Sequence, residues 1–355
     1  MVFEALRGWF ERRRALRELR AIEGRDNAAY SGFFSDQIDV AKSEFDQGRR
    51  EKALETWRKM HAQYPDLCLT SEKAFNLFVD LGNHDEAEAL IQEGRRRYPR
   101  HKALYATVFA RVAYRRGDLE EALRRYDIVR RGFPRVADGY GIAAACFSDL
   151  GRQDEAEAML ERGVQMLPNN LDLCIRYAQD ATRRHDWPEG LQRWKYVWNR
   201  FEPTVGLLGQ AECLKEMGRF DEAEKLLIEA CDRFHMNPWP FAELANLSTA
   251  KGDFDETVRR WEAVLSRFPW FEFAYPKAAE ALRQVGRHAE SDEILRVGMI
   301  RSPAHLAINL EYARNAHRRG DWVAATERWA LVRERFPECI EARERELESL
   351  AALER

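Results

Sequence analysis

The sequence predicts an all-α fold, a right-handed solenoid in which pairs of helices follow one another along the chain. The first observation behind this prediction is a glycine that recurs about every 34 residues. The other two are small residues and a proline that keep fixed distances from it. A period this strict indicates a helical repeat array rather than a single globular core. The recurring glycines are Gly48, Gly82, Gly117, Gly151, Gly218, Gly252, Gly286 and Gly320, and His185 fills the missing place.

Each repeat is expected to contain two amphipathic helices that meet at this glycine. Glycine suits the end of the first helix because it adopts a left-handed conformation without a Cβ penalty. A small residue stands five residues after it, as Ala53 does, and another stands seven residues before it, as Ala41 does. On facing helices, small residues let the helix axes approach closely. The second repeat departs from the pattern, with Phe75 at the latter position and Ala74 beside it.

A proline closes most repeats 17 residues after the glycine. Proline cannot continue a helix, so it is expected to stop the second helix and set the turn into the next repeat. Pro203 is displaced by one residue, and His235 replaces the expected proline of the sixth repeat. The other closing prolines are Pro65, Pro99, Pro134, Pro168, Pro269, Pro303 and Pro337.

A second periodicity spans two repeats and predicts the core. Nine residues after the glycine position, a large aromatic residue in odd repeats alternates with leucine or isoleucine in even ones. Eight residues before the glycine, odd repeats again carry a larger residue. Large side chains opposite small ones interdigitate at native packing density, so the building block is predicted to be a pair of repeats. The residues of the first set are Trp57, Ile91, Tyr126, Leu160, Trp194, Leu227, Trp261, Leu295 and Trp329; those of the second are Val40, Phe109, Tyr177, Leu244 and Tyr312.

These features resemble the tetratricopeptide repeat (TPR) family, most clearly in segments 151–168, 218–230 and 320–337. The resemblance covers about nine tandem repeats, residues 34–339. It implies a concave groove, lined by the first helices, that holds an extended peptide or a helix of a partner. Asn and Arg side chains there can bond a peptide backbone or an acidic group, although solvated groove residues are the alternative interpretation. The groove positions carried over are Asn76, Arg111, Arg176, Gln179, Glu243, Asn246, Lys277, Glu311 and Arg314.

A second candidate site is a set of aromatic residues near the joints of the seventh and eighth repeats. The repeat pattern does not require them. They either seal a bend in the array or form an exposed binding surface, and the sequence leaves both interpretations open. These residues are Trp239, Trp270, Phe271 and Phe273.

Composition bounds the functional class. The chain of 355 residues carries 57 basic and 60 acidic residues, a net charge of −3, so it lacks the basic footprint of a nucleic-acid binder. It contains no run of 18 apolar residues, and a membrane span is therefore not expected. Six scattered cysteines without a CxxC pair indicate buried thiols in a reducing compartment, which favours a cytoplasmic protein. No nucleotide-binding, hydrolase or metalloprotease motif is present, and neither catalysis nor a cofactor is expected.

The two ends of the chain are predicted to differ from the repeats. Residues 1–22 are expected to form an amphipathic helix, which either caps the first repeat or docks on a membrane surface or a partner. Residues 23–33 are expected to form a linker, and residues 340–355 a C-terminal capping helix with Ile340, Leu347 and Leu350 on one side. Membrane contact would use Phe3, Leu6, Trp9 and Phe10.

The sequence therefore favours a non-catalytic scaffold that binds a segment of a partner protein in its groove. The alternative is an accessory subunit of a membrane-associated polysaccharide or cell-envelope assembly system, with catalysis in a partner. In that case the protein would lie in the cytoplasm at the inner face of the membrane, and the aromatic residues would contact sugar rings. Because a repeat fold does not define a ligand, the partner is open.

Overall fold

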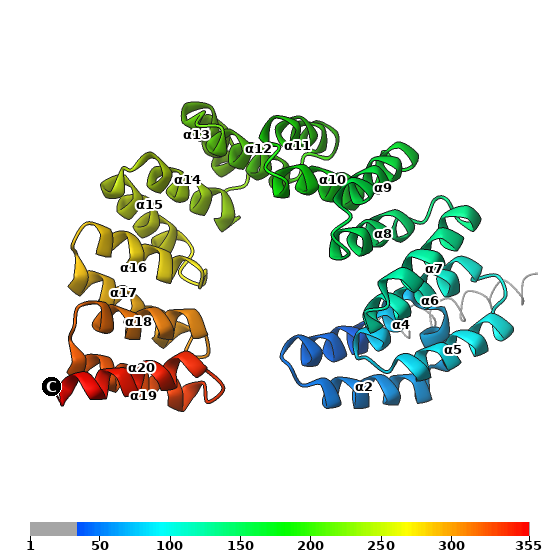
Figure 1. Ribbon diagram of the computed structural model, residues 1–355, viewed down its shortest axis with the longest axis horizontal. Coiled ribbons are helices and arrows are strands. Elements are labelled where there is room, and N and C mark those ends of the chain that lie inside the picture. Colours follow the sequence, from blue (N-terminus) through cyan, green and yellow to red (C-terminus); the bar gives the residue numbers. More distant parts are fainter. Residues whose placement is uncertain (1–33, 355) are drawn as a thin grey trace, which may run out of the picture. The chain divides into compact units, whose positions relative to one another are not determined.

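The computed structural model describes residues 34–354, and every regular element in this range is a helix. This confirms the all-α repeat fold. The chain divides into two compact bodies (Figure 1): the N-terminal body ends at Tyr177 and the C-terminal body begins at Ala178. The predicted N-terminal helix and linker, residues 1–33, lie outside the described residues, as do the proposed membrane contacts Phe3, Leu6, Trp9 and Phe10.

In the N-terminal body, the first described helix covers residues 34–46. It is followed by α2 (Arg50–Gln63), α3 (Pro65–Thr70), α4 (Glu72–Asp80), α5 (His84–Arg97), α6 (Lys102–Arg116), α7 (Leu119–Gly132), α8 (Asp138–Asp149) and α9 (Gln153–Met166). The boundary between the bodies falls within α10 (Leu171–Arg183). The C-terminal body continues with α11 (Trp187–Phe201), α12 (Thr204–Glu216), α13 (Phe220–Arg233), α14 (Pro238–Lys251), α15 (Phe254–Arg267), α16 (Ala274–Gln284), α17 (His288–Arg301), α18 (Leu306–Arg318), α19 (Trp322–Arg335) and α20 (Ile340–Leu353).

The predicted turn between the two helices of each repeat is confirmed. All eight recurring glycines have positive φ, between 69° and 82°. His185, which takes the missing place, has a φ of 59° and therefore adopts the same left-handed conformation at a side-chain cost that glycine avoids. The second helices end two residues before the closing prolines, as α7 does at Gly132 before Pro134. The residue before a proline is restricted to non-helical backbone, which explains this constant offset.

The predicted core positions are buried. Ala53 and Ala41 are fully inaccessible, and so are Tyr126 and Trp329 nine residues after their glycine positions. Large side chains face small ones as predicted. One example is Gly298, twelve residues after the turn at Gly286, which faces the ring of Tyr275. A Cβ atom added to Gly298 would lie 2.9 Å from the ring of Tyr275, so a larger side chain would overpack the core.

The second repeat is interrupted where the sequence departs from the pattern. Its first helix is divided into α3 and α4, and Ser71 between them has extended backbone. The Ser71 side chain accepts a hydrogen bond from the N–H of Ala74 at 3.3 Å and so caps α4. The shortened α4 turns Phe75 and Ala74 together into the core, which accounts for the irregular register.

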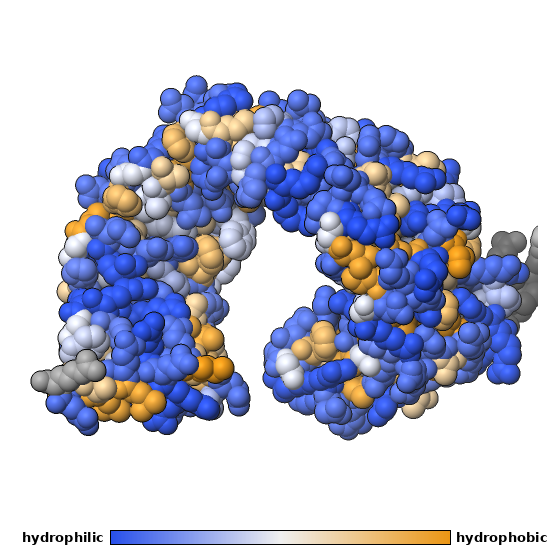
Figure 2. Space-filling model, viewed as in Figure 1, coloured by the Kyte–Doolittle hydropathy of each residue, from blue (hydrophilic) through white to orange (hydrophobic). Residues whose placement is uncertain are grey.

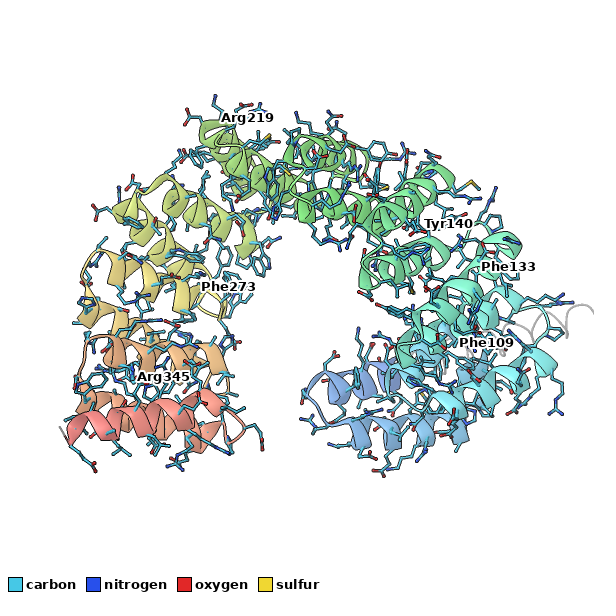
Figure 3. The ribbon with its side chains drawn as sticks, in the orientation of Figure 1. Phe109, Phe133, Tyr140, Arg219, Phe273 and Arg345 are labelled. Carbon is cyan, nitrogen blue, oxygen red and sulfur yellow. The ribbon has the colours of Figure 1, made fainter. Side chains whose placement is uncertain are left out.

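One part of the predicted core is only partly buried. The larger residues eight positions before the glycine are not buried: Val40 is 48% exposed, and Phe109 and Tyr312 are half-buried. Two of these rings instead carry an arginine from the second helix of the same repeat. The Arg125 guanidinium lies 3.5 Å from the Phe109 ring centroid, and Arg328 lies 3.8 Å from Tyr312. Figure 3 shows Phe109 on α6. Cation–π contact therefore adds to the packing of Phe109 and Tyr312 against the core.

The same arginines join consecutive repeats through what we call a carboxylate bridge. In a bridge, one acidic side chain of an even repeat pairs with two cations of the next repeat. Asp292 pairs with Arg319 at 2.9 Å and with Arg328 at 2.7 Å. Glu88 pairs likewise with Arg116 and Arg125 at 3.1 and 3.3 Å. Glu224 forms a third bridge, with Lys251 and Arg260. The bridges follow the two-repeat alternation and join the second repeat to the third, the sixth to the seventh and the eighth to the ninth.

The predicted C-terminal helix is present as α20, which packs against α19 (Figure 1). It packs through the small residues Ala342 and Ser349, whereas Ile340 and Leu347 are exposed. Most of the surface visible in Figure 2 is hydrophilic, and apolar residues form separate patches on it. This agrees with a sequence in which 33% of residues are charged.

Candidate functional site

The aromatic residues near the joint of the seventh and eighth repeats form one connected cluster. The Trp239 ring lies 5.1 Å from that of Phe271 and 5.4 Å from that of Phe273, measured between centroids. Phe271 is buried, so it seals the joint. Trp239 and Phe273 are 44% and 39% exposed, and Trp270 is 63% exposed. The base of the cluster therefore closes the joint, and three of its rings face solvent.

Local backbone structure fixes these rings in place. Trp239 is the second residue of α14, between Pro238 and Pro240, and its N–H donates to Asn237 Oδ1 at 3.1 Å. Proline is well tolerated in the first turn of a helix, so the start of α14 is defined. In the other segment, the N–H of Phe271 donates to the carbonyl of Phe268 at 2.9 Å, and a second turn leads into α16. Figure 3 shows Phe273 at the start of α16, away from the glycine turns such as that beside Arg219.

An open apolar pocket of about 510 Å³ adjoins this cluster. Its walls come from the end of α13, the start of α14 and the joint before α16. Two of its polar groups are already engaged. Arg233 pairs with Glu202 and lies 4.8 Å above the Trp198 ring, and Asn237 Oδ1 caps α14. The lining residues are Arg233, Phe234, His235, Met236, Asn237, Pro238, Trp239, Trp270 and Phe271.

A second pocket, of about 310 Å³, lies between α16 and α18 and is rich in charge. Three of its cations are held by carboxylates. Lys277 pairs with Glu280 at 3.1 Å, and Glu311 pairs with Arg314 and Arg318 at 2.7 and 2.9 Å. Burial acts to raise the pKa of Glu311, but the two guanidiniums outweigh it and hold that pKa below its ordinary value. The lining residues are Phe273, Pro276, Lys277, Glu280, Arg283, His305, Ala307, Leu310, Glu311, Arg314 and Arg318.

Phe273 connects the two pockets. It lines the charged pocket and contacts Trp239, which lines the apolar one. From the sequence, the aromatic residues and the groove residues were predicted as two separate sites. In the C-terminal body they adjoin, and Lys277, Glu311 and Arg314 of the predicted groove share a pocket with Phe273. We call this combined surface the joint groove.

The other predicted groove residues lie outside these two pockets. Arg111 on α6 pairs with Asp138 on α8 at 2.8 Å, and Arg176 on α10 pairs with Asp172 at 2.7 Å. Asn76 is half-buried on α4, and its Oδ1 atom has no hydrogen-bond partner within the described residues. Gln179 is exposed on α10, whereas Glu243 and Asn246 are half-buried on α14. The nine predicted residues are thus divided between the two bodies.

Arg283 is a site residue that the sequence did not indicate. It is half-buried in the wall of the charged pocket. Among residues 34–354, its Nε atom has no hydrogen-bond partner and its guanidinium has no carboxylate partner. A signal for the joint groove itself was present in the sequence. Trp239 and Phe273 both stand 13 residues before their glycines, Gly252 and Gly286, so they occupy equivalent positions of consecutive first helices.

Within residues 34–354, no group of three or more His, Cys, Asp or Glu side chains is arranged to hold a metal ion. No helix in this range is long and apolar enough to cross a membrane. Burial raises the pKa of the Cys213 thiol to about 12, so it stays protonated near neutral pH and is a poor nucleophile.

Comparison with known proteins agrees with this architecture. Residues 107–170 match the sequence model of the tetratricopeptide repeat family. Among solved structures, yeast Tom70 is similar with a TM-score of 0.58 and 15% identity, over 79% of this chain and 59% of that protein. A tetratricopeptide repeat protein from Parabacteroides merdae has 16% identity over 71% of this chain and 98% of its own, with a TM-score of 0.49. No curated protein matches.

The paired helices and their glycine turns define a helical-repeat protein. Residues 107–170 match the tetratricopeptide repeat model, and paired helices continue on both sides of the match. Members of this family generally act as protein-interaction scaffolds, and they are generally not catalytic.

Proposed function

We propose that this protein is a scaffold that binds an extended segment of a partner protein in the joint groove of its C-terminal body. The observation that carries the proposal is the exposure of Trp239, Trp270 and Phe273 beside a charged pocket. Exposed aromatic residues beside polar groups are typical of binding surfaces, since they bury a large apolar area on association. A cytoplasmic location remains the expectation.

The test is affinity capture of partners from lysate of the source cell, read by mass spectrometry. The variant Trp270→Ala removes the most exposed ring of the cluster, and Lys277→Glu reverses a charge in the second pocket. Arg314 is a poor choice, because it also pairs with Glu341 of α20 at 2.6 Å and its loss would disturb packing. Ile300→Ala is the matched control, an 81% exposed residue outside both pockets.

We expect one set of partners to be captured by the wild type and by Ile300→Ala and to be lost from Trp270→Ala. The wild type and the three variants must first show equal helicity and the same melting temperature. Retention of the same partners by Trp270→Ala and by Lys277→Glu would exclude the joint groove as the binding surface. The alternative role in polysaccharide assembly rests on residues 1–22, outside the described range, and on aromatic stacking with sugars.

A further inference from the structure

Resting on the proposed function, we propose that the joint groove recognises a specific class of segment. It is an extended, proline-containing stretch. A proline ring would lie in the apolar pocket beside Trp239 and Trp270, called the aromatic pocket below, and an acidic side chain would pair with Arg283.

The aromatic pocket favours proline over a polar ligand. Its exposed rings are Trp239 and Trp270, and Met236 beside them is also exposed. Arg233 and Asn237 Oδ1 are engaged within the protein, which leaves His235 as the main polar side chain of the lining. The hydroxyls of a sugar would therefore find few partners, and burying them unpaired costs free energy. A proline ring is apolar and carries no N–H to satisfy. Proline-rich segments dock in aromatic-lined grooves because their extended conformation is already formed before binding.

The charged pocket supplies the second contact. Lys277, Arg314 and Arg318 are held by carboxylates of the protein. Arg283 is the cation of this pocket that has no carboxylate partner in residues 34–354, and its Nε atom is buried without a hydrogen bond. A half-buried guanidinium forms its strongest hydrogen bonds with a carboxylate, often through two N–H groups at once. An acidic side chain of the ligand would pair with this guanidinium through its terminal N–H groups.

The spacing of the two contacts follows from helix geometry. Phe273 precedes α16 beside the aromatic pocket, and Arg283 lies in the last turn of that helix, ten residues later. At 1.5 Å per residue this corresponds to roughly 15 Å along the helix axis. An extended proline-type chain rises about 3.1 Å per residue. The proline and the acidic residue of the ligand are therefore expected to be separated by roughly five residues.

An amphipathic helix fits this surface less well. A helical ligand needs a continuous apolar stripe to bury its own apolar face. In the joint groove, the aromatic residues are followed along α16 by Lys277 and Glu280, which form an ion pair on the surface. The exposed aromatic rings lie at one end, and charged side chains line the other beside Pro276, Ala307 and Leu310, which suits an extended chain with one apolar and one acidic anchor.

The experiment is a calorimetric titration of the full chain with synthetic peptides capped at both ends. The probe carries a Pro-Pro pair, a Gly/Ser spacer of about five residues, and a Glu-Glu pair; a second version has the reverse order. One control peptide replaces proline by alanine, and another replaces glutamate by glutamine. The protein variants are Trp270→Ala and Arg283→Gln, with Arg301→Gln as the matched control for an exposed arginine outside both pockets.

We expect one order of the probe to bind, and each change of an anchor to weaken binding about tenfold, which corresponds to ~1.4 kcal/mol. The decisive result is the coupling of the pairs. Arg283→Gln should weaken binding of the glutamate probe but leave binding of the glutamine control unchanged. Likewise, Trp270→Ala should weaken binding of the proline probe but leave binding of the alanine control unchanged. A structural role of Arg283 would weaken both peptides equally and would overturn the assignment.

A display library of random peptides, selected on the full chain, separates failure of this inference from failure of the proposed function. Enrichment of proline and an acidic residue at the stated spacing would support the inference. Trp270-dependent peptides without these features would overturn the inference but leave the proposed function intact. If no selected peptide depends on Trp270, both fail. Absence of binding by both orders of the synthetic probe also overturns the inference.

Discussion

Equivalent positions of the two bodies are used in different ways. In the N-terminal body, Arg111 and Asp138 of the third and fourth repeats form an ion pair between adjacent first helices, at 2.8 Å. In the C-terminal body, the corresponding positions of the seventh and eighth repeats carry Asn246 and Phe273. The first joint is closed by two groups that satisfy each other. The second leaves an aromatic ring exposed beside Trp239.

The end of the array repeats the closed arrangement. Arg314 of the ninth repeat pairs with Glu341 of α20 in the same relation as Arg111 with Asp138. An ion pair on the first-helix face thus closes these two joints. The joint of the seventh and eighth repeats has no such pair at the equivalent positions, Asn246 and Phe273, and the proposed binding surface lies there.

The largest expected effect comes from the core beneath the open joint. Trp261 is buried, with its ring 6.4 Å from that of Phe273. Trp261→Ala should lower the free energy of unfolding by about 3–5 kcal/mol, because it removes a large apolar side chain and leaves a cavity. Chemical denaturation followed by circular dichroism measures this. A loss below ~1 kcal/mol would mean that the ring does not support the joint.

The next effect concerns the carboxylate bridges, which join repeats away from the open joint. Three hydrogen bonds, from Arg328, Arg319 and Asn315, outweigh the burial of Asp292 and lower its pKa from 3.8 to about 2. The unfolded chain therefore binds more protons between these values. The resulting stabilisation, about 2 kcal/mol, is present above pH ~4 and is lost as the pH falls toward 2.

The measurement is the free energy of unfolding against pH for the wild type and for Asp292→Asn. The wild type should lose stability between pH ~5 and 2 more steeply than the variant, because the amide does not titrate. At neutral pH, Asp292→Asn should also be the less stable protein, since two arginines lose their counter-charge. Parallel pH profiles would show that the bridge does not contribute.

A smaller effect should appear beneath the closed joint. Tyr126 occupies the position in the third repeat that Trp261 occupies in the seventh, and its hydroxyl is buried without a hydrogen-bond partner within residues 34–354. Tyr126→Phe removes this unsatisfied group and keeps the ring. Stability should stay equal or rise by up to ~1 kcal/mol. A clear loss in thermal melting would reveal a partner for the hydroxyl.

The smallest effect on stability is expected at the surface ring of the open joint. Trp270→Ala should change the free energy of unfolding by no more than ~0.5 kcal/mol, because the side chain is 63% exposed. Partner binding should nevertheless fall strongly. Loss of stability and loss of binding in equal measure would indicate that Trp270 only seals the joint.

The repeat fold was predictable because its signals are local and recur. The left-handed turn at each glycine and the stop at each proline depend on backbone chemistry, and even His185 could be placed by the period. The break at Ser71 was visible only as an irregular register, since a single cap residue decides where α4 begins. The residues eight before each glycine were expected in the core but are only partly buried, and arginines from the next helix cover two of their rings.

The site was only partly predictable. The repeat pattern separates residues that it requires from those that it does not, and this identified Trp239, Trp270 and Phe273. It does not show which charged residues have partners. Arg314 and Glu311 satisfy one another, whereas Arg283 has no carboxylate partner in the described range, and that difference depends on contacts between helices.

The most direct test of the comparison is photo-crosslinking at one position in each body. A photoreactive phenylalanine analogue replaces Trp270 in one protein and the exposed Ile128 of α7 in another, and each full chain is irradiated in lysate of the source cell. The account predicts a crosslink from position 270 to one segment of a partner, containing proline and an acidic residue, and none from position 128. Crosslinks of the same kind from both positions, or none from position 270, would contradict it.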